Sequence, residues 1–291
     1  MILGALEMGG TKMVLAIGNE NGEIFEKNVI PCKNPDETLK DIADYFKSRN
    51  IEALGIGSFG PLCLDRTKEK YGYITSTPKP GWADTNVKGF LEQKLGCHAG
   101  FDTDVNAAAL GEATFGDSRG IKDMIYVTVG TGIGVGVLIN GQLLHGMTHP
   151  EAGHISVRIH PSDSFDGNCP YHRNCLEGMA SGPAIYKRYG TQGETICADD
   201  KAWEIESFYL AQGIVNWCMC YSPKRIVVGG GVFEKEGLIQ RVRKDFVSLM
   251  NGYVLSDEMN DIDSFIIKSS LEGNQGIMGC FRLAYIEKEP A

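Results

Sequence analysis

Two stretches of the chain share one pattern of short strands and glycine turns, and this repetition restricts the possible folds more than any other feature. Each stretch contains three apolar strands joined first by a Gly-rich turn and then by Asn-Gly, a typical two-residue hairpin turn. The strands are expected at residues 2–8, 13–18 and 23–30, and again at residues 124–129, 135–139 and 142–144. The repetition predicts a duplicated architecture, although the residue identities of the two units match weakly and two unrelated hairpins remain the alternative.

The other segments alternate between helical and strand patterns, which is typical of an α/β fold with a substantially parallel sheet. Helices are expected at residues 36–47, 85–95, 105–112, 182–189, 201–220, 235–250 and 274–286, and single strands at 53–57, 99–103 and 225–228. No shift in composition marks a linker. The pattern predicts a small N-terminal α/β domain at residues 1–105, joined by the C-terminal helix at 274–286, and a larger α/β domain at residues 106–273.

The charge balance argues against two classes of partner. The 291 residues include 28 Lys and Arg against 37 Asp and Glu, a formal net charge of −9, and the basic residues form no block. Nucleic acids and anionic membrane surfaces are bound through clustered positive charge, so neither is expected here. Residues 124–150 contain no Asp, Glu, Lys or Arg, but their six glycines favour buried strands over a membrane span.

The cysteines and the first residues indicate a reducing compartment. Nine cysteines are an odd number and are scattered along the chain, and the opening residues 1–5 lack the basic and long apolar regions of a signal peptide. The protein is therefore expected to be cytoplasmic, with reduced thiols.

The first Gly-rich turn, Gly9-Gly10-Thr11-Lys12, is a candidate phosphate site. It is not a Walker A loop, because a strand-like run follows it where that loop requires a helix. A hairpin tip can still offer backbone N–H groups, the Thr11 hydroxyl and the Lys12 ammonium to a polyphosphate. Glu7, just before the turn, is suited to hold a hydrated Mg²⁺. A plain glycine turn is the alternative.

Two later glycine clusters are further candidates. Gly130, Thr131, Gly132 and Gly134 lie between strand-like runs, so they fit a second phosphate hairpin better than a dinucleotide fingerprint, which needs a helix after the strand. Two such hairpins facing each other would hold a triphosphate. Gly229, Gly230 and Gly231 follow a buried strand and would let an adenosine lie close to the backbone, although the three glycines taken alone favour a simple strand-to-helix turn.

Asp104 is the candidate catalytic carboxylate. It ends an expected strand and precedes an Ala-rich helix, and ligands of α/β sheets bind at the carboxyl ends of strands. The same position is also favourable for an ordinary helix N-cap.

Four residues in the irregular segment 145–176 fit a zinc site. His154, Cys169, His172 and Cys175 supply two imidazoles and two thiolates, which suit tetrahedral Zn²⁺. Because all four ligands would come from the protein, this zinc would be structural. Chance clustering is the alternative, since the spacing is not that of a standard zinc finger.

Together these residues resemble the ROK family of sugar kinases, which share the actin-like ATPase fold, and within it the fructokinase branch. The matching stretches are residues 9–12, 57–61, 77–82, 103–112, 130–134, 149–154 and 169–177. The resemblance implies a two-domain actin-like ATPase fold, a duplicated ribonuclease H-like α/β architecture with a central cleft. Many ROK kinases have Asp at the position of Glu7 and Asn at that of Thr103, and both departures look like the fructokinase branch.

The resemblance also implies an activity and residue roles. ATP would phosphorylate the 6-hydroxyl of a hexose, D-fructose foremost, with Mg²⁺ held through water near Glu7 and Asp104. Asp104 would be the catalytic base, and Glu151, His154 and Glu177 would line the sugar pocket. The turns at 9–12 and 130–134 would hold phosphates, residues 229–231 would lie near adenosine, and the protein would be a homodimer. The alternatives are a kinase that prefers mannose or glucose, and a non-catalytic sugar sensor.

Overall fold

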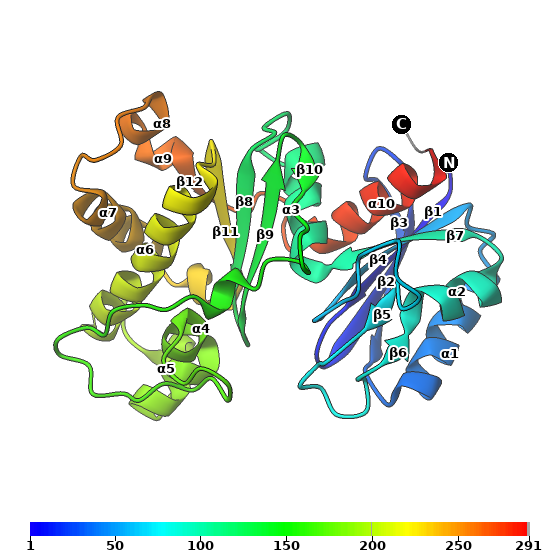
Figure 1. The fold of residues 1–291 in the computed structure, drawn as a ribbon, viewed down its shortest axis with the longest axis horizontal. Helices are drawn as coiled ribbons and strands as arrows, with labels where there is room; N and C mark the ends of the chain where they lie inside the picture. Colours follow the sequence, from blue (N-terminus) through cyan, green and yellow to red (C-terminus); the bar gives the residue numbers. More distant parts are fainter. Residues whose placement is uncertain (199, 290–291) are drawn as a thin grey trace.

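The computed structural model describes residues 1–198 and 200–289, and it contains two five-stranded sheets side by side (Figure 1). The first sheet has the order β3 (Ile24–Pro31), β2 (Lys12–Gly18), β1 (Leu3–Met8), β4 (Ala53–Ser58), β7 (His98–Thr103). The second has the order β10 (Gln142–Leu143), β9 (Ile133–Ile139), β8 (Met124–Val129), β11 (Arg225–Gly229), β12 (Ile266–Lys268).

The two sheets have the same topology. In each, the first three strands of the unit are antiparallel neighbours, a later strand pairs in parallel with the first strand, and a still later one pairs in parallel with that strand at the edge of the sheet. The predicted duplication is therefore confirmed, and the alternative of two unrelated hairpins is wrong. A small two-stranded sheet, β5 (Tyr73–Ile74) with β6 (Thr85–Asn86), belongs to the first half.

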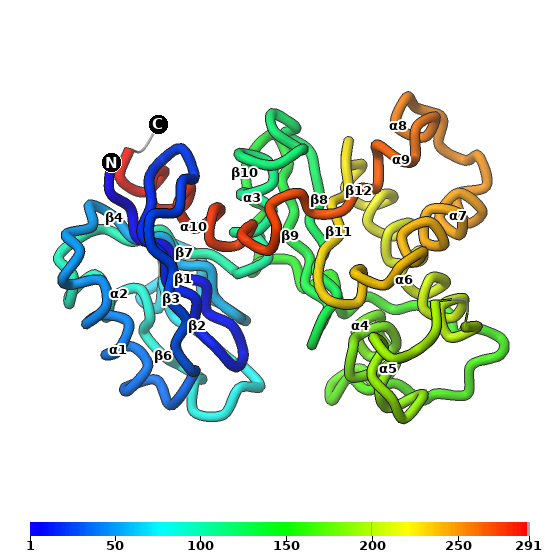
Figure 2. Tube along the Cα trace, turned by 180° about the vertical axis from the view of Figure 1, so that it is seen from behind, coloured from blue at the N-terminus to red at the C-terminus, as the bar shows by residue number. Residues whose placement is uncertain are grey.

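Helices cover both faces of the first sheet. α1 (Pro35–Lys47) and α2 (Val87–Leu95) lie on one face, and α1 begins where the Asn34 side chain accepts a hydrogen bond from the Glu37 N–H. The last helix, α10 (Gln275–Lys288), packs on the other face against β1, β4 and β7 (Figure 2). The approach is close, because a Cβ on Gly55 of β4 would lie 1.7 Å from the Cys280 carbonyl oxygen.

α3 (Asp104–Phe115) connects the two halves. It packs against α10 and also against β8 and β9 of the second sheet. Its buried Glu112 accepts hydrogen bonds from the Ser269 hydroxyl at 2.5 Å and from the N–H and hydroxyl of Ser270 at 3.0 and 2.9 Å. The division of the chain at residue 105 stays a prediction.

Successive side chains of β8 point to opposite faces of the second sheet, and each face packs against a different set of helices. Met124 and Tyr126 face the cluster built with α3 and α10, while Ile125 and Val127 face the core beneath α6 (Ala202–Tyr221) and α7 (Leu238–Met250). This period of two is what a strand buried on both faces requires. The remaining helices are short: α4 (Leu176–Ala180), α5 (Gly182–Tyr189), α8 (Asp257–Asn260), α9 (Ile262–Phe265) and the 3₁₀ turns Ala152–His154, Gly193–Thr195 and Gly231–Glu234.

Several predicted boundaries need correction. β9 begins at Ile133, two residues before the expected strand, so the Gly turn ahead of it is shorter. The helix expected from residue 235 begins at Leu238 and follows a 3₁₀ turn, and residues 85–86 form a strand before α2. β12, α4, α8 and α9 were not predicted because three to five residues carry too little periodic signal. Within the described residues, no helix combines the length and apolarity needed to cross a membrane.

Candidate active site and metal centre

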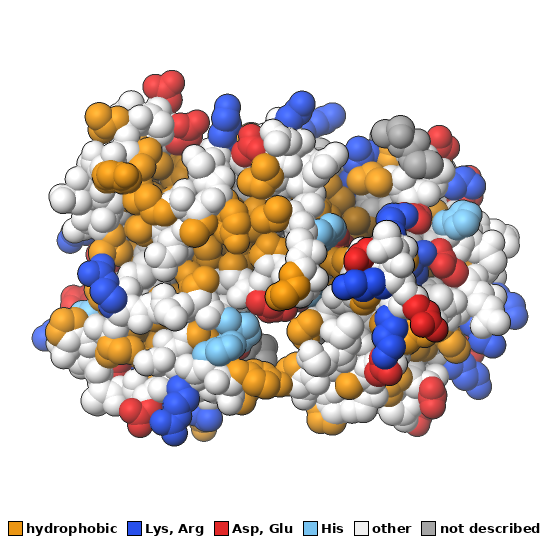
Figure 3. Space-filling view, in the orientation of Figure 1, with side chains coloured by type: hydrophobic (Ala, Val, Ile, Leu, Met, Phe, Trp, Pro, Cys, Tyr) orange, Lys and Arg blue, Asp and Glu red, His pale blue; other side chains and the backbone are white. Residues whose placement is uncertain are grey.

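A cleft of about 900 Å³ lies between the two halves. Gly10, Phe59 and Asp104 line it from the first half of the chain, and Thr131, His149 and Glu177 line it from the second. On the face drawn in Figure 3 a notch separates the halves, with histidine side chains beside it. Residues far apart in the sequence therefore meet in one cavity.

Asp104 lies at the carboxyl end of β7, in the first turn of α3. The N-cap of α3 is Thr103, whose hydroxyl accepts a hydrogen bond from the Asn106 N–H at 3.1 Å. The alternative of Asp104 as an ordinary N-cap is therefore wrong. Burial, and after it the nearby charge of Glu7, raises the pKa of Asp104 to about 7.

Glu7 lies on β1 beside the first turn of α10. A Cβ on Gly276 would lie 2.6 Å from its Oε2. Burial raises the pKa of Glu7, and the ammonium groups of Lys27 and Lys12 partly oppose this effect. Because the charge of Glu7 raises the pKa of Asp104, a divalent cation near both carboxylates would relieve their repulsion. Hard oxygen ligands of this kind fit Mg²⁺.

The first Gly turn closes tightly between β1 and β2. The Gly9 N–H donates to the Lys12 carbonyl at 3.0 Å, and the Thr11 carbonyl accepts from the Cys32 N–H at 3.0 Å. Gly10, Thr11 and Lys12 are exposed, and Gly10 lines the cleft. The tip thus offers backbone N–H groups and one ammonium near the cavity.

The second Gly turn faces the same cavity. The Gly130 N–H donates to the Gly132 carbonyl at 2.9 Å, and Gly130, Thr131 and Gly132 all line the cleft. Gly134 also reaches the cleft wall, but it lies inside β9, and a Cβ there would lie 2.4 Å from Val105 Cγ1. Close packing of α3 on β9 is therefore enough to explain glycine at position 134.

A second cavity of about 810 Å³ adjoins the cleft, and Gly130 and Thr131 line both. Of the three consecutive glycines at the end of β11, Gly229 to Gly231, only Gly231 lines this second cavity. Gly230 has φ +88°, and a Cβ there would lie 2.3 Å from the Val129 carbonyl oxygen. Gly229 lies against the Tyr126 hydroxyl in the same way. Close packing against the Tyr126 side chain and the Val129 backbone is thus a sufficient reason for glycine at positions 229 and 230.

The three sugar-pocket candidates line the cleft together. Glu177 Oε2 accepts a hydrogen bond from the Ile133 N–H at 3.0 Å, and its Oε1 lies 3.9 Å from His154 Nε2. Glu151 is about half exposed, and burial followed by the charge of Glu177 raises its pKa. Carboxylates and imidazoles arranged in this way can bind several hydroxyl groups.

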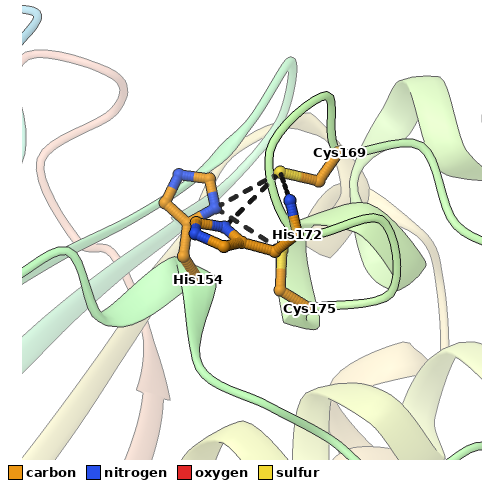
Figure 4. A group of neighbouring side chains, drawn as sticks. All are labelled: His154, Cys169, His172 and Cys175. Carbon is orange, nitrogen blue, oxygen red and sulfur yellow. Dashed lines mark hydrogen bonds between the residues drawn. The ribbon is translucent and has the colours of Figure 1, made fainter. Parts of the chain in front are cut away.

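The four zinc candidates converge in the loop before α4 (Figure 4). Their ligand atoms all lie within 4.8 Å of one another. His154 Nδ1 lies 3.5 Å from Cys175 Sγ and 3.7 Å from Cys169 Sγ, and Cys169 Sγ lies 3.8 Å from His172 Nδ1. Zn–N and Zn–S bonds of usual length in a tetrahedron separate N and S by about 3.6 Å. The cluster therefore has the dimensions of a closed zinc site.

Two histidines that the sequence analysis did not single out join the halves beside the cleft. The His145 ring lies 2.8 Å from the buried Asp102 carboxylate, and this hydrogen bond raises the pKa of His145. His149 Nε2 accepts from the Leu62 N–H at 3.1 Å, and burial lowers the pKa of His149. His149 begins one matched stretch, but no spacing rule pairs it with a residue of the first half.

The sequence of this chain is similar to one protein family and to proteins of known function. The model of the ROK family matches residues 3–287. The fructokinase of Pediococcus pentosaceus is 43% identical over 284 residues, covering 98% of each chain, and that of Zymomonas mobilis is 44% identical over 293 residues, covering 97% of this chain and 96% of its own.

A solved structure agrees with the fold. The ROK hexokinase of Thermus thermophilus superposes with a TM-score of 0.81 at 25% identity and covers 99% of both chains. This match confirms the predicted actin-like ATPase fold. With the family model spanning nearly the whole sequence and relatives above 40% identity along its length, the chain belongs to the ROK family.

Proposed function

We propose that the protein transfers the γ-phosphoryl group of ATP to the 6-hydroxyl of a hexose, D-fructose foremost. The observation that carries the proposal is one cleft lined by Asp104 and by two Gly turns, one from each half of the chain. Relatives at 43% and 44% identity named fructokinase support the choice of sugar. The presence of Asp104 at the strand end favours a kinase over a non-catalytic sensor.

In the proposed reaction Asp104 takes the proton of the 6-hydroxyl as its oxygen attacks in line. Phosphoryl transfer needs positioning and charge stabilisation more than covalent help. Residues 9–12 and 130–132, with Gly134 at the edge, would hold the phosphates, and the 810 Å³ cavity beside Gly231 would take the adenosine. Glu7 and Asp104 would hold hydrated Mg²⁺, which neutralises phosphate charge when bound. Glu151, His154 and Glu177 would bind the sugar hydroxyls.

ADP release in a coupled assay tests the proposal. With ATP and Mg²⁺, the highest kcat/KM is expected for fructose, ahead of mannose and glucose. No ADP release with any of the three would reject the kinase and leave the sugar sensor, which would still bind a hexose by calorimetry. Faster turnover of mannose or glucose would reject only the choice of fructose.

The pH dependence of the reaction is the next prediction. Asp104 must be deprotonated to act as a base, and its pKa is raised to about 7 in the free protein. kcat/KM, which reports groups of the free enzyme, should therefore fall as pH drops through 7, approaching tenfold per pH unit. A profile from pH 5.5 to 9 measures this. A kcat/KM that stays level down to pH 5.5 would contradict the assignment.

We also propose that His154, Cys169, His172 and Cys175 bind one structural Zn²⁺. The N–S distances of 3.5 to 3.8 Å support it. With Nδ1 turned toward the sulfurs, His154 keeps Nε2 on the side of Glu177, so one ring can serve both metal and sugar. A closed shell leaves no position for an activating water.

We propose a homodimer, which the resemblance implies, working in the cytoplasm. Apolar side chains gather on the surface between α6 and β9 (Figure 3), and α6 carries Met219, whose exposed fraction is 47%. The nine cysteines are unpaired, which fits a reducing compartment. Light scattering that gives the 31.7 kDa mass of one chain would contradict the dimer.

A further inference from the structure

Residues 77–82, one of the stretches that resemble the ROK family, lie beside the cleft but are not among the residues assigned to ATP, Mg²⁺ or the sugar. They belong to the loop between β5 and β6, and Ser76 and Pro78 line the cavity. Trp82 anchors the loop, because it is fully buried, packs edge-on against Phe59 at 5.4 Å and donates from its indole N–H to the Lys33 carbonyl at 3.1 Å. The loop is therefore held in a defined position.

Backbone contacts fix Lys79 within this loop. Its N–H donates to the Thr77 hydroxyl at 3.3 Å, and its carbonyl accepts from the Trp82 N–H at 3.3 Å. The Lys79 side chain then reaches the tip of the first Gly turn, where its ammonium donates to the Gly10 carbonyl. The ammonium also lies 5.3 Å from the centre of the Phe59 ring.

The partners of this ammonium are weak for a cation. Among the described residues no carboxylate lies within 4.0 Å of Lys79 Nζ, and the Gly10 carbonyl and the Phe59 ring are uncharged. Lys70, in the segment just before β5, instead pairs with Asp84 at 2.6 Å. A phosphoryl oxygen would be a stronger partner for Lys79 than a neutral carbonyl, since hydrogen bonds between two charged groups are the strong ones.

The position suits the charge that develops during transfer. Gly10, Pro78 and Asp104 line one cavity, and Lys79 follows Pro78 in the chain and contacts Gly10, so its ammonium lies beside the cavity that Asp104 lines. As the bond from the sugar 6-oxygen to phosphorus forms and the bond to ADP breaks, the proton goes to Asp104 and negative charge spreads over the γ-phosphoryl oxygens. A flexible lysine stem allows the ammonium to move from Gly10 to those oxygens.

We propose that Lys79 is a catalytic residue of the kinase reaction, contacting the γ-phosphoryl group of ATP and stabilising its charge during transfer. The inference rests on the proposed function and deepens it. In this proposal Lys79 contacts the γ-phosphoryl group, whereas the backbone N–H groups of the two Gly turns bind the α- and β-phosphates. Lys79 exchanges the Gly10 carbonyl for the transferred group when ATP is bound.

Lys79→Met tests the inference, because it keeps most of the stem and removes the charge. Loss of one preorganised contact to developing charge typically costs roughly 10²-fold in kcat, and a loss of that order is expected here. Calorimetry should show about tenfold weaker binding of an imido-bridged, non-hydrolysable ATP analogue, in the range of a lost charge-assisted contact. Binding of ADP, which has no γ-phosphoryl group, should be unchanged. Lys79→Arg should restore part of the analogue affinity.

Lys70→Met is the matched control, since it removes a lysine from the same part of the chain and should leave all three quantities as in the wild type. Lys79→Gln keeps a donor for Gly10 without the charge, and it should behave like Lys79→Met if the charge matters. A near-normal kcat and unchanged analogue binding in Lys79→Gln would overturn the proposal. So would equal weakening of ADP and analogue, which would mean that Lys79 only supports the turn. The two binding measurements need no hexose, so they remain decisive even if the wild type phosphorylates none.

Discussion

Asp104→Asn should lower kcat by roughly 10²–10⁴-fold, the usual contribution of a positioned general base. The substitution keeps the shape of the side chain, and the amide oxygen can still accept the hydrogen bond from the Val105 N–H, which is 2.9 Å long in the wild type. The helix cap is unaffected because Thr103 provides it. ATP binding should therefore stay nearly intact. Steady-state kinetics with fructose and calorimetry with the ATP analogue measure the two effects.

The same variant should be more stable than the wild type at pH 8. Burial raises the pKa of Asp104 from its ordinary value of 3.8 to about 7, so the ionisation of this carboxyl opposes folding by an amount that grows between these two pH values and is constant above pH 7. Asparagine is neutral throughout. The gain in unfolding temperature should be full at pH 8 and shrink as the pH falls from 7 to 3.8, below which the wild-type carboxyl is protonated in both the folded and the unfolded state.

Asp117→Asn is the matched control, because Asp117 is exposed on the loop after α3 and makes its hydrogen bonds through its backbone. It should change neither kcat nor the pH dependence of stability. A near-normal kcat in Asp104→Asn would remove Asp104 from the chemistry. Retained activity together with a lower unfolding temperature would leave it a purely structural role at the start of α3.

Local signals explain what the sequence predicted well. The bounds of α5 agree with the prediction because both ends have capping residues. Ser181 caps the first turn, and Gly190 ends the helix with φ +71°. The duplicated sheets were visible because each unit is a continuous hairpin pattern. β12 is only three residues long and forms its pairs with β11, about forty residues earlier, so nothing local marks it.

In the candidate site, too, local spacing predicted some residues, while contacts between distant residues were not predicted. Cys169, His172 and Cys175 lie close in sequence, so their spacing predicted a metal site that the structure brings together. The contact of Lys79 with Gly10 spans 69 residues and that of His149 with Leu62 spans 87. Such pairs depend on how the loops fold over the cleft, which periodicity and motif spacing do not encode. At Gly229 and Gly230 close packing against Tyr126 and Val129 is a sufficient reason for glycine, so the role of these two residues near adenosine stays a prediction.

Loss of a zinc ligand is expected to have a large effect on stability and on sugar binding. Cys175→Ser should release the metal, lower the unfolding temperature and raise the KM for fructose by roughly tenfold or more, while the KM for ATP changes less. The reason is connectivity: Cys175 immediately precedes α4, which carries Glu177, and His154 belongs to both the cluster and the cleft wall. Metal binding orders such a loop, so its loss costs folding free energy.

Cys220→Ser is the matched control, since Cys220 is exposed on α6 away from the cluster, and it should leave zinc content, stability and kinetics unchanged. Elemental analysis of tag-free protein should give one zinc per chain, and a chelator should reproduce the effects of Cys175→Ser in the wild type. Well under one zinc per chain, with no change in unfolding temperature after chelation, would reject the site.

Comparison of His154→Ala with His172→Ala separates the two roles of His154. Both variants lose one imidazole ligand, but only His154 directs its other nitrogen toward Glu177, with Nε2 3.9 Å from the carboxylate. His172 is exposed and contacts the rest of the cluster through Cys169 and the His154 ring. The KM for fructose should therefore rise further in His154→Ala than in His172→Ala at equal zinc loss. Equal KM values would mean that His154 serves the metal alone and that the sugar hydroxyls are bound by Glu151 and Glu177.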